Sequence, residues 1–263
     1  MPGASTALAQ GANEAEFTYL FDSDAEGWTA GFADLPVDHD QQTFELDSGH
    51  RALPDGLHQS SGMFMQGHNR SDDLFMYLKR QVDGLQPNTT YDVSVTIDLA
   101  TNVQAGVFGI GGAPGESVFV KAGASTVEPT AAEGDNRHLR MNIDKGNQSQ
   151  GGADMVVIGN VAHSEVTGSE YRLKTLDNAG QPLSVETDGN GRVWLIVGTD
   201  SGFEGLTAIY YARIAYTLTG PEAAPATGGA SLPGWAMAYV AAIGGLVAAI
   251  GVVLLVRSRR RRA

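Results

Sequence analysis

The sequence predicts an all-β protein, a two-sheet β-sandwich followed by one C-terminal transmembrane helix. From Phe17 onward, short apolar alternations are separated by clusters of Gly, Asp, Asn and Pro. No apolar repeat of 3.6 residues is sustained before the tail, so long amphipathic helices are not expected. Near the end, an uninterrupted apolar run is long enough to cross a bilayer.

The clearest strand is 90–99, where apolar and polar residues alternate without a break. Such alternation places one face on a core and the other in solvent. The core face of this strand is expected to hold Tyr91, Val93, Val95, Ile97 and Leu99. The final strand, 206–218, is expected to bury Leu206, Ala208, Tyr210, Ile214, Tyr216 and Leu218.

The remaining segments that predict strands are shorter, and together they suit two packed sheets. Between them, the Gly-, Ala- and Pro-rich segments 101–116 and 122–137 are either mobile loops or covers folded over one sheet face. The other predicted strands are 17–21, 28–32, 43–47, 62–66, 74–82, 117–121, 138–143, 155–158, 171–175, 183–187 and 193–197.

The charge balance excludes one class of partner. The chain carries 17 basic and 30 acidic side chains, for a net charge of −13. A surface of this sign repels phosphate, so nucleic acid is not an expected partner, whereas neutral sugars and divalent cations are compatible. No cysteine is present, which argues against a small scaffold held by disulfides.

The two ends of the chain predict where it works. The apolar run 235–256 is followed by a basic tail, 257–263, with five arginines that favour a cytoplasmic C-terminus. Residues 220–234 then form a Pro/Ala/Gly linker, and 10–219 form an extracellular β-sandwich domain. The Ala-Leu-Ala at 7–9 predicts that 1–9 are the remnant of an export signal. The expected protein is a single-pass membrane protein of the cell surface with its N-terminus outside.

The linker also resembles a sortase cell-wall sorting signal. In APATGG, Pro225, Thr227 and Gly228 match LP-x-T-G, and Ala224 stands where the signal has leucine. The resemblance implies cleavage between Thr227 and Gly228 by a sortase. A plain membrane anchor is the favoured alternative, because it requires no enzyme that tolerates the substitution.

Three patches give a resemblance for the outer domain. FDSDAEGW, LKRQVDGLQPNTTYDVSVTIDL and the aromatic strand YYARIAY resemble the galactose-binding-like jelly rolls, the architecture of many carbohydrate-binding modules. The segment GIGGAPGESVFVKAGAS is similar to one in uncharacterised exported bacterial proteins. The resemblance implies a jelly roll that binds sugar. Its structural calcium is in doubt, because Ala212 and Arg213 stand where such modules often have an Asp.

One strand offers a candidate glycan surface. In 74–82, the face formed by Asp73, Phe75, Tyr77 and Lys79 sets two aromatic rings among polar side chains. Sugars stack their C–H faces on such rings while polar neighbours bind the hydroxyls. The alternative is that a long loop covers both rings and makes them a second small core.

Two acidic sets complete the candidates. Asp22, Asp24 and Glu26 lie in one short segment and offer oxygen ligands for structural calcium, although solvated carboxylates are more common. Asp200 and Glu204 offer the carboxylate pair that glycoside cleavage requires. The sequence therefore predicts a surface binding or adhesion module for carbohydrate. A glycoside-active enzyme and a purely structural envelope protein remain as alternatives.

Overall fold

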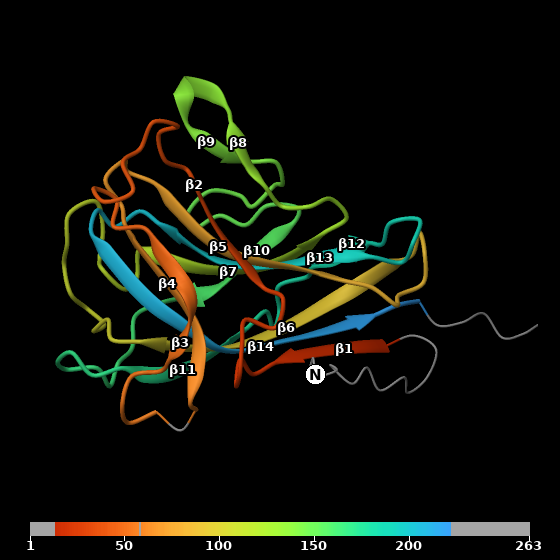
Figure 1. Ribbon diagram of the computed structural model, residues 1–263, viewed down its shortest axis with the longest axis horizontal. Helices are drawn as coiled ribbons and strands as arrows, with labels where there is room; N and C mark the ends of the chain where they lie inside the picture. The colour runs from red at the N-terminus through yellow and green to blue at the C-terminus, as the bar shows by residue number, and fades with distance from the viewer. Residues whose placement is uncertain (1–13, 58, 222–263) are drawn as a thin grey trace, which may run out of the picture. The chain divides into compact units, whose positions relative to one another are not determined.

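The computed structural model describes residues 14–57 and 59–221, all within one compact unit, and these residues form a sandwich of two antiparallel sheets (Figure 1). The predicted all-β sandwich is confirmed. Among the described residues, no helix is long and apolar enough to span a bilayer. The segments predicted as signal remnant, linker, transmembrane helix and basic tail, with Thr227 and Gly228, lie outside the described residues.

The seven-stranded sheet has the order β11-β6-β14-β4-β3, with β1 paired to β14 and β12 paired to β6. Its strands are β1 (Glu14–Tyr19), β3 (Asp47–Ala52), β4 (Ser61–His68), β6 (Thr90–Thr101), β11 (Arg172–Asp177), β12 (Ser184–Glu186) and β14 (Leu206–Thr219).

The five-stranded sheet has the order β10-β7-β13-β5-β2. Its strands are β2 (Thr29–Ala33), β5 (Leu74–Val82), β7 (Val118–Ser125), β10 (Met155–Asn160) and β13 (Val193–Ser201). A separate hairpin, β8 (Ala131–Glu133) with β9 (Leu139–Met141), encloses a 3₁₀ turn at Asp135–Arg137 and projects at the top of Figure 1.

The main core lies between the two sheets. The five apolar side chains predicted to point inward from β6 are all buried there, which confirms the alternation. Burying one such side chain contributes about 1.5–3 kcal/mol. The hydroxyl of Tyr216 in β14 joins the layers by donating to the backbone oxygens of Ile196 (2.8 Å) and Gly123 (3.1 Å) on the opposite sheet.

The prediction for β14 is wrong in its first half. Its pairing with β6 shifts register between Tyr211 and Arg213, which is a β-bulge. An extra residue inverts the alternation on one side of the bulge. Ile209 and Tyr211 are therefore buried, while Tyr210 turns to the outer face with Leu206 and Ala208.

The strand predicted at 43–47 is also wrong. The Asp40 carboxylate accepts the Thr43 amide N–H at 2.7 Å, and the Phe44 amide N–H donates to the Asp40 carbonyl at 3.0 Å. These contacts hold a tight turn, because an Asp side chain satisfies nearby backbone N–H groups. The strand starts only at Asp47.

A cover segment, defined here as residues 126–154, lies over the outer face of the five-stranded sheet. It contributes Ile143 to a second core that contains Phe75, Tyr77 and Ile196. The predicted loop 122–137 thus begins as the last part of β7 and continues as a cover. The other predicted loop, 101–116, carries Phe108, which is 97% exposed.

Candidate functional site

The candidate glycan surface on β5 alternates as predicted, but the cover segment closes it. Phe75 is 0% exposed and Tyr77 is 4% exposed, and their rings stack at 5.5 Å. Lys79 Nζ binds the Glu128 carboxylate at 2.6 Å and donates to the Pro129 carbonyl at 2.8 Å, which ties the cover to the sheet. The alternative of a second small core therefore describes these rings, and they offer no open stacking surface.

The acidic set Asp22, Asp24 and Glu26 is used to build a turn. Glu26 Oε1 accepts the amide N–H groups of Leu20 (3.0 Å) and Phe21 (2.6 Å), while Asp24 Oδ1 accepts that of Glu26. Among the residues with described positions, these three carboxylates do not form a group close enough to share an ion. Asp24 and Glu26 thus serve the turn here, and calcium binding by this set stays a prediction.

The pair Asp200 and Glu204 does not form a cleft. Asp200 is fully buried in β13, whereas Glu204 is exposed in the turn that follows. A carboxylate that cleaves a glycoside must reach its substrate. Asp200 instead belongs to a buried cluster that the sequence analysis did not identify.

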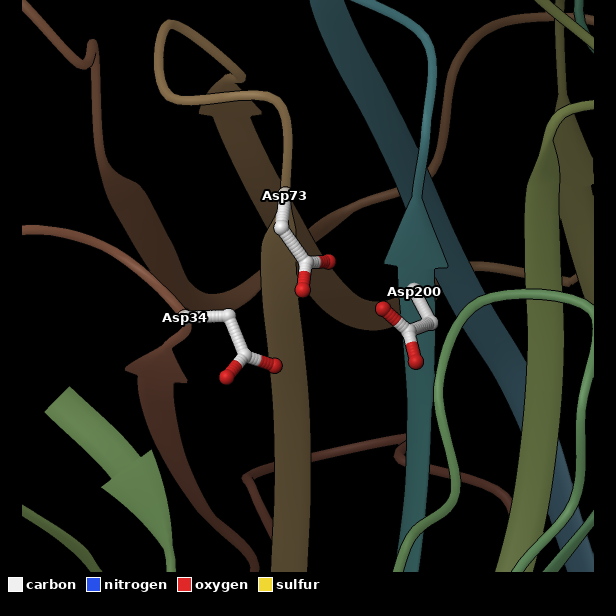
Figure 2. Close-up of side chains that lie close together, drawn as sticks. All are labelled: Asp34, Asp73 and Asp200. Carbon is white, nitrogen blue, oxygen red and sulfur yellow. The ribbon is translucent and has the colours of Figure 1, made fainter. Parts of the chain in front are cut away.

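Three aspartates from distant parts of the chain meet beneath the cover segment. Asp34 follows β2, Asp73 precedes β5, and Asp200 lies near the end of β13. One carboxylate oxygen of each lies within 4.8 Å of the others. Figure 2 shows the three carboxyl groups converging, with those of Asp73 and Asp200 facing each other.

Three cations enter the same cluster. Asp200 Oδ2 lies 2.8 Å from Lys121 Nζ and 2.7 Å from Lys145 Nζ. Asp34 lies 2.8 Å from Lys145 Nζ and 2.6 Å from Arg140 Nη1. Lys121 comes from β7, while Lys145 and Arg140 come from the cover segment. Ionic contacts therefore hold the cover on the sheet.

Burial and neighbouring charges shift the protonation of this cluster. Burial, with the negative charges of Asp200 and Asp34, raises the pKa of Asp73 to about 8. Burial lowers the pKa of Lys121. Burial also disfavours the charged forms of Lys145 and Asp200, but the opposite charges in contact with each of them outweigh the effect of burial. The pKa of Lys145 is therefore raised, and that of Asp200 is lowered.

The cluster does not fit a metal ion. Three carboxylates at this spacing are a set that a divalent cation can use. Here, however, two ammonium groups and one guanidinium already neutralise them. A cation would have to displace the two buried ammonium groups of Lys121 and Lys145, which would then lose their buried counter-charges.

A second arrangement of side chains lies on the outer face of the seven-stranded sheet. Phe64 of β4 and Tyr210 of β14 are register partners, and their rings are 4.9 Å apart. Tyr171, just before β11, packs edge-on against Tyr210 at 5.6 Å. We call Phe64, Tyr210 and Tyr171 the aromatic row. Phe64 is nearly buried, whereas both tyrosines are partly exposed.

Polar side chains flank the aromatic row on both sides. Gln66 lies two residues after Phe64 in β4, on the same face, and is the register partner of Asp47 in β3. On the other side, Arg51 of β3 places its guanidinium 4.3 Å from the Phe64 ring centre. Arg213 pairs with Asp98, which accepts the Thr175 hydroxyl at 2.6 Å. Donors and acceptors thus border the rings within one sheet face.

Alternation along the sequence does not reveal this row, because β14 contains a bulge. Unbroken alternation places Tyr210 in the core, and only an extra residue at Ala212 brings it outward. Phe64 and Tyr171 stand in predicted strands, but nothing local to either shows that they meet. Pairing across β4, β14 and β11 brings them together.

An open groove of about 720 Å³ lies elsewhere on the domain, where the 178–184 loop borders β6. Its lining mixes polar and apolar residues, and the polar ones include Asp92, Ser94, Asn178 and Gln181. Asn178 supports the loop by donating to the Val93 carbonyl at 2.9 Å. The groove contains no aromatic ring, so it offers no stacking surface.

Comparisons with known proteins identify no family. No protein-family model and no curated protein matches the sequence. Among solved structures, the chain is similar to a family 11 carbohydrate-binding module from Clostridium thermocellum solved with a mixed-linked tetrasaccharide. The identity is 8%, the TM-score is 0.34, and the match covers 80% of this chain and 98% of that one.

Two further solved structures show likenesses of the same low level. The adhesin domain of Lys-gingipain from Porphyromonas gingivalis has 10% identity and a TM-score of 0.35, with 78% of this chain and 98% of that one covered. Tailspike protein 4 of bacteriophage CBA120 has 10% identity and a TM-score of 0.33, and 74% of this chain spans only 20% of that one. Likenesses this distant carry no conclusion about what this chain binds.

Proposed function

We propose that the chain is a cell-surface module that binds neutral carbohydrate on the outer face of its seven-stranded sheet. The observation that carries the proposal is the aromatic row, with two partly exposed tyrosines on a sheet face bordered by polar side chains. A pyranose ring stacks its C–H face on an aromatic plane, and its hydroxyls require donors and acceptors at the edge.

The proposed ligand is neutral because of the charge of the protein. A net charge of −13 disfavours anionic polysaccharides over most of the surface. The two arginines beside the row are already engaged, Arg51 with Asp47 at 2.6 Å and Arg213 with Asp98 at 3.7 Å. Because each of these charges already has a carboxylate partner, the remaining N–H groups can donate to sugar hydroxyls.

The location is part of the same proposal and is supported by the sequence. The apolar run 235–256 with its arginine tail suits a single-pass anchor, and the APATGG segment suits sortase processing. Either arrangement displays the domain outside the cell.

The test is binding of the full-length chain, purified in detergent, to an array of neutral polysaccharides. Tyr210→Ala and Tyr171→Ala should each weaken binding about tenfold, since an aromatic contact contributes about 0.5–1.5 kcal/mol beyond its buried area. Phe108→Ala is the matched control, because it removes an almost fully exposed ring far from the row in sequence.

Absence of binding to every neutral glycan would overturn the proposal. So would glycan binding that both tyrosine variants retain at full strength. Loss of binding in Gln181→Ala, with binding unchanged in the tyrosine variants, would move the site to the open groove beside the 178–184 loop.

A further inference from the structure

We propose that Lys121 and Asp200 become joined by an intramolecular isopeptide bond, formed without another enzyme, with Asp73 as the group that transfers protons. Such a bond would link β7 to β13 covalently beneath the cover segment. It is a modification site independent of the proposed carbohydrate surface.

The two reacting groups are placed together by neighbouring strands. β7 and β13 pair antiparallel, with Lys121 opposite Gly198 and Asp200 opposite Phe119, so both side chains leave the same face two positions apart. Lys121 Nζ lies 2.8 Å from Asp200 Oδ2, and both side chains are 0% exposed. Burial excludes the water that would favour hydrolysis, and fixed contact replaces a bimolecular encounter.

The surroundings of Asp200 Oδ2 suit a developing negative charge. Lys145 Nζ lies 2.7 Å from this oxygen, and the Gln148 amide N–H donates to it at 2.9 Å. Two donors on one oxygen stabilise the oxyanion that forms when an amine attacks a carboxyl carbon. Lys121 Nζ is also held by the carbonyls of Lys145 (2.8 Å) and Gln150 (2.9 Å), which fix its position.

The other oxygen of Asp200 is free to leave. Oδ1 of Asp200 and Oδ1 of Asp73 are both buried, and neither receives a hydrogen bond within the described part of the chain. The two carboxyl groups face each other in Figure 2. A proton on Asp73 would satisfy both oxygens and would be placed to protonate the departing one.

Protonation favours the roles of Lys121, Asp73 and Lys145, whereas the lowered pKa of Asp200 means that Lys121 and Asp73 must supply its protons. Burial lowers the pKa of Lys121, which makes its neutral, nucleophilic amine more accessible. Burial raises the pKa of Asp73 to about 8, so this group is available as an acid at neutral pH. Lys145 has a raised pKa and remains the cation beside Oδ2.

The reaction balances without a co-reactant. Lys121 passes one proton to Asp200 Oδ2, which it contacts at 2.8 Å, and Asp73 passes its proton to Oδ1. The neutral nitrogen of Lys121 then forms a bond to Asp200 Cγ, and the new nitrogen returns a proton to the Asp73 carboxylate. Asp73 protonates the Oδ1 hydroxyl, the C–O bond breaks to release water, and Oδ2 returns its proton to Asp73 as the amide C=O forms. An ammonium and a carboxylate become one amide and one water molecule, and Asp73 is regenerated.

The experiment is mass spectrometry of the purified full-length chain. Under denaturing conditions, its mass should be lower by one water molecule than the sequence predicts. Trypsin should leave Lys121 uncut and yield a branched product that joins peptides 81–137 and 193–213. Lys121→Met should restore the missing water and release 193–213 as a linear peptide. Lys79→Met, which removes an outer lysine of the same sheet face, should keep the branched product.

Asp73→Asn tests the proton-transfer role and should leave the two peptides separate or join them at least tenfold more slowly. A wild-type chain of full mass, with linear 81–121 and 193–213, would overturn the proposal whether or not any variant folds. A branch through Lys145, or an unchanged rate in Asp73→Asn, would overturn the assigned roles.

Discussion

Replacement of Phe75 by alanine tests whether the rings on β5 are core or binding surface. Phe75 is 0% exposed, stacks on Tyr77 at 5.5 Å and lies 4.8 Å from Lys145 Nζ. Removal of a fully buried phenylalanine costs about 3–5 kcal/mol through lost burial and the cavity left behind. The lost cation–π contact adds about 0.5–2 kcal/mol. The expected total, about 3.5–7 kcal/mol, is a large share of the roughly 5–15 kcal/mol that stabilises a typical domain.

The assay is urea unfolding of the purified chain followed by tryptophan fluorescence, with Phe108→Ala as the matched control. The control should change the free energy of unfolding by less than about 0.5 kcal/mol, because an exposed ring has little burial to lose. A Phe75→Ala variant that loses less than about 1 kcal/mol would refute the second-core assignment. Loss of glycan binding without loss of stability would restore Phe75 as a ligand contact.

Three further predictions follow from single contacts. Asp73 holds a proton in the folded protein up to about pH 8, whereas its ordinary pKa is 3.8. Between these two pH values the folded state binds more protons than the unfolded state, so the free energy of unfolding should fall as the pH rises through that window. Asp73→Asn should flatten this decline in pH-dependent urea unfolding, and an unchanged slope would contradict it. Glu26→Ala should lower the free energy of unfolding by about 1.5–3 kcal/mol, because a charged acceptor of two amide N–H groups is lost. Asp22→Ala should change the free energy of unfolding little. When calcium is added to the wild-type protein, its melting temperature should not change. Tyr216→Phe should cost about 1–3 kcal/mol, because two buried carbonyls lose their shared donor. An equally stable variant would show that water replaces the hydroxyl.

Regular strands were predictable because their information is local. In β6, a side-chain period of two fixes which residues face inward, and no distant contact changes that assignment. The bounds predicted for 74–82 agree with β5 for the same reason. Prediction failed where one residue interrupts the period, as at Ala212, or where a side chain competes for backbone N–H groups, as at Asp40.

The candidate sites depended on contacts between segments that are distant in the sequence. The alternation of Phe75 and Tyr77 was correct, but their exposure depended on the cover segment, which lies about fifty residues further along the chain. Proximity in the sequence pairs Asp200 with Glu204, whereas the contacts of Asp200 in the fold are with Lys121 and Lys145. Proximity in the sequence was therefore a poor guide to which charges share one site.

The sequence by itself determined the β class, the acidic surface and the inward faces of the regular strands, because periodicity and composition are properties of neighbouring residues. Only the tertiary structure decided which sheet face is covered, which tyrosine turns outward, and that Asp34, Asp73 and Asp200 meet two lysines in one buried cluster. The physical reason is that burial and ionic contact arise between strands brought together by folding, and a linear pattern contains no record of which distant segment will lie on top.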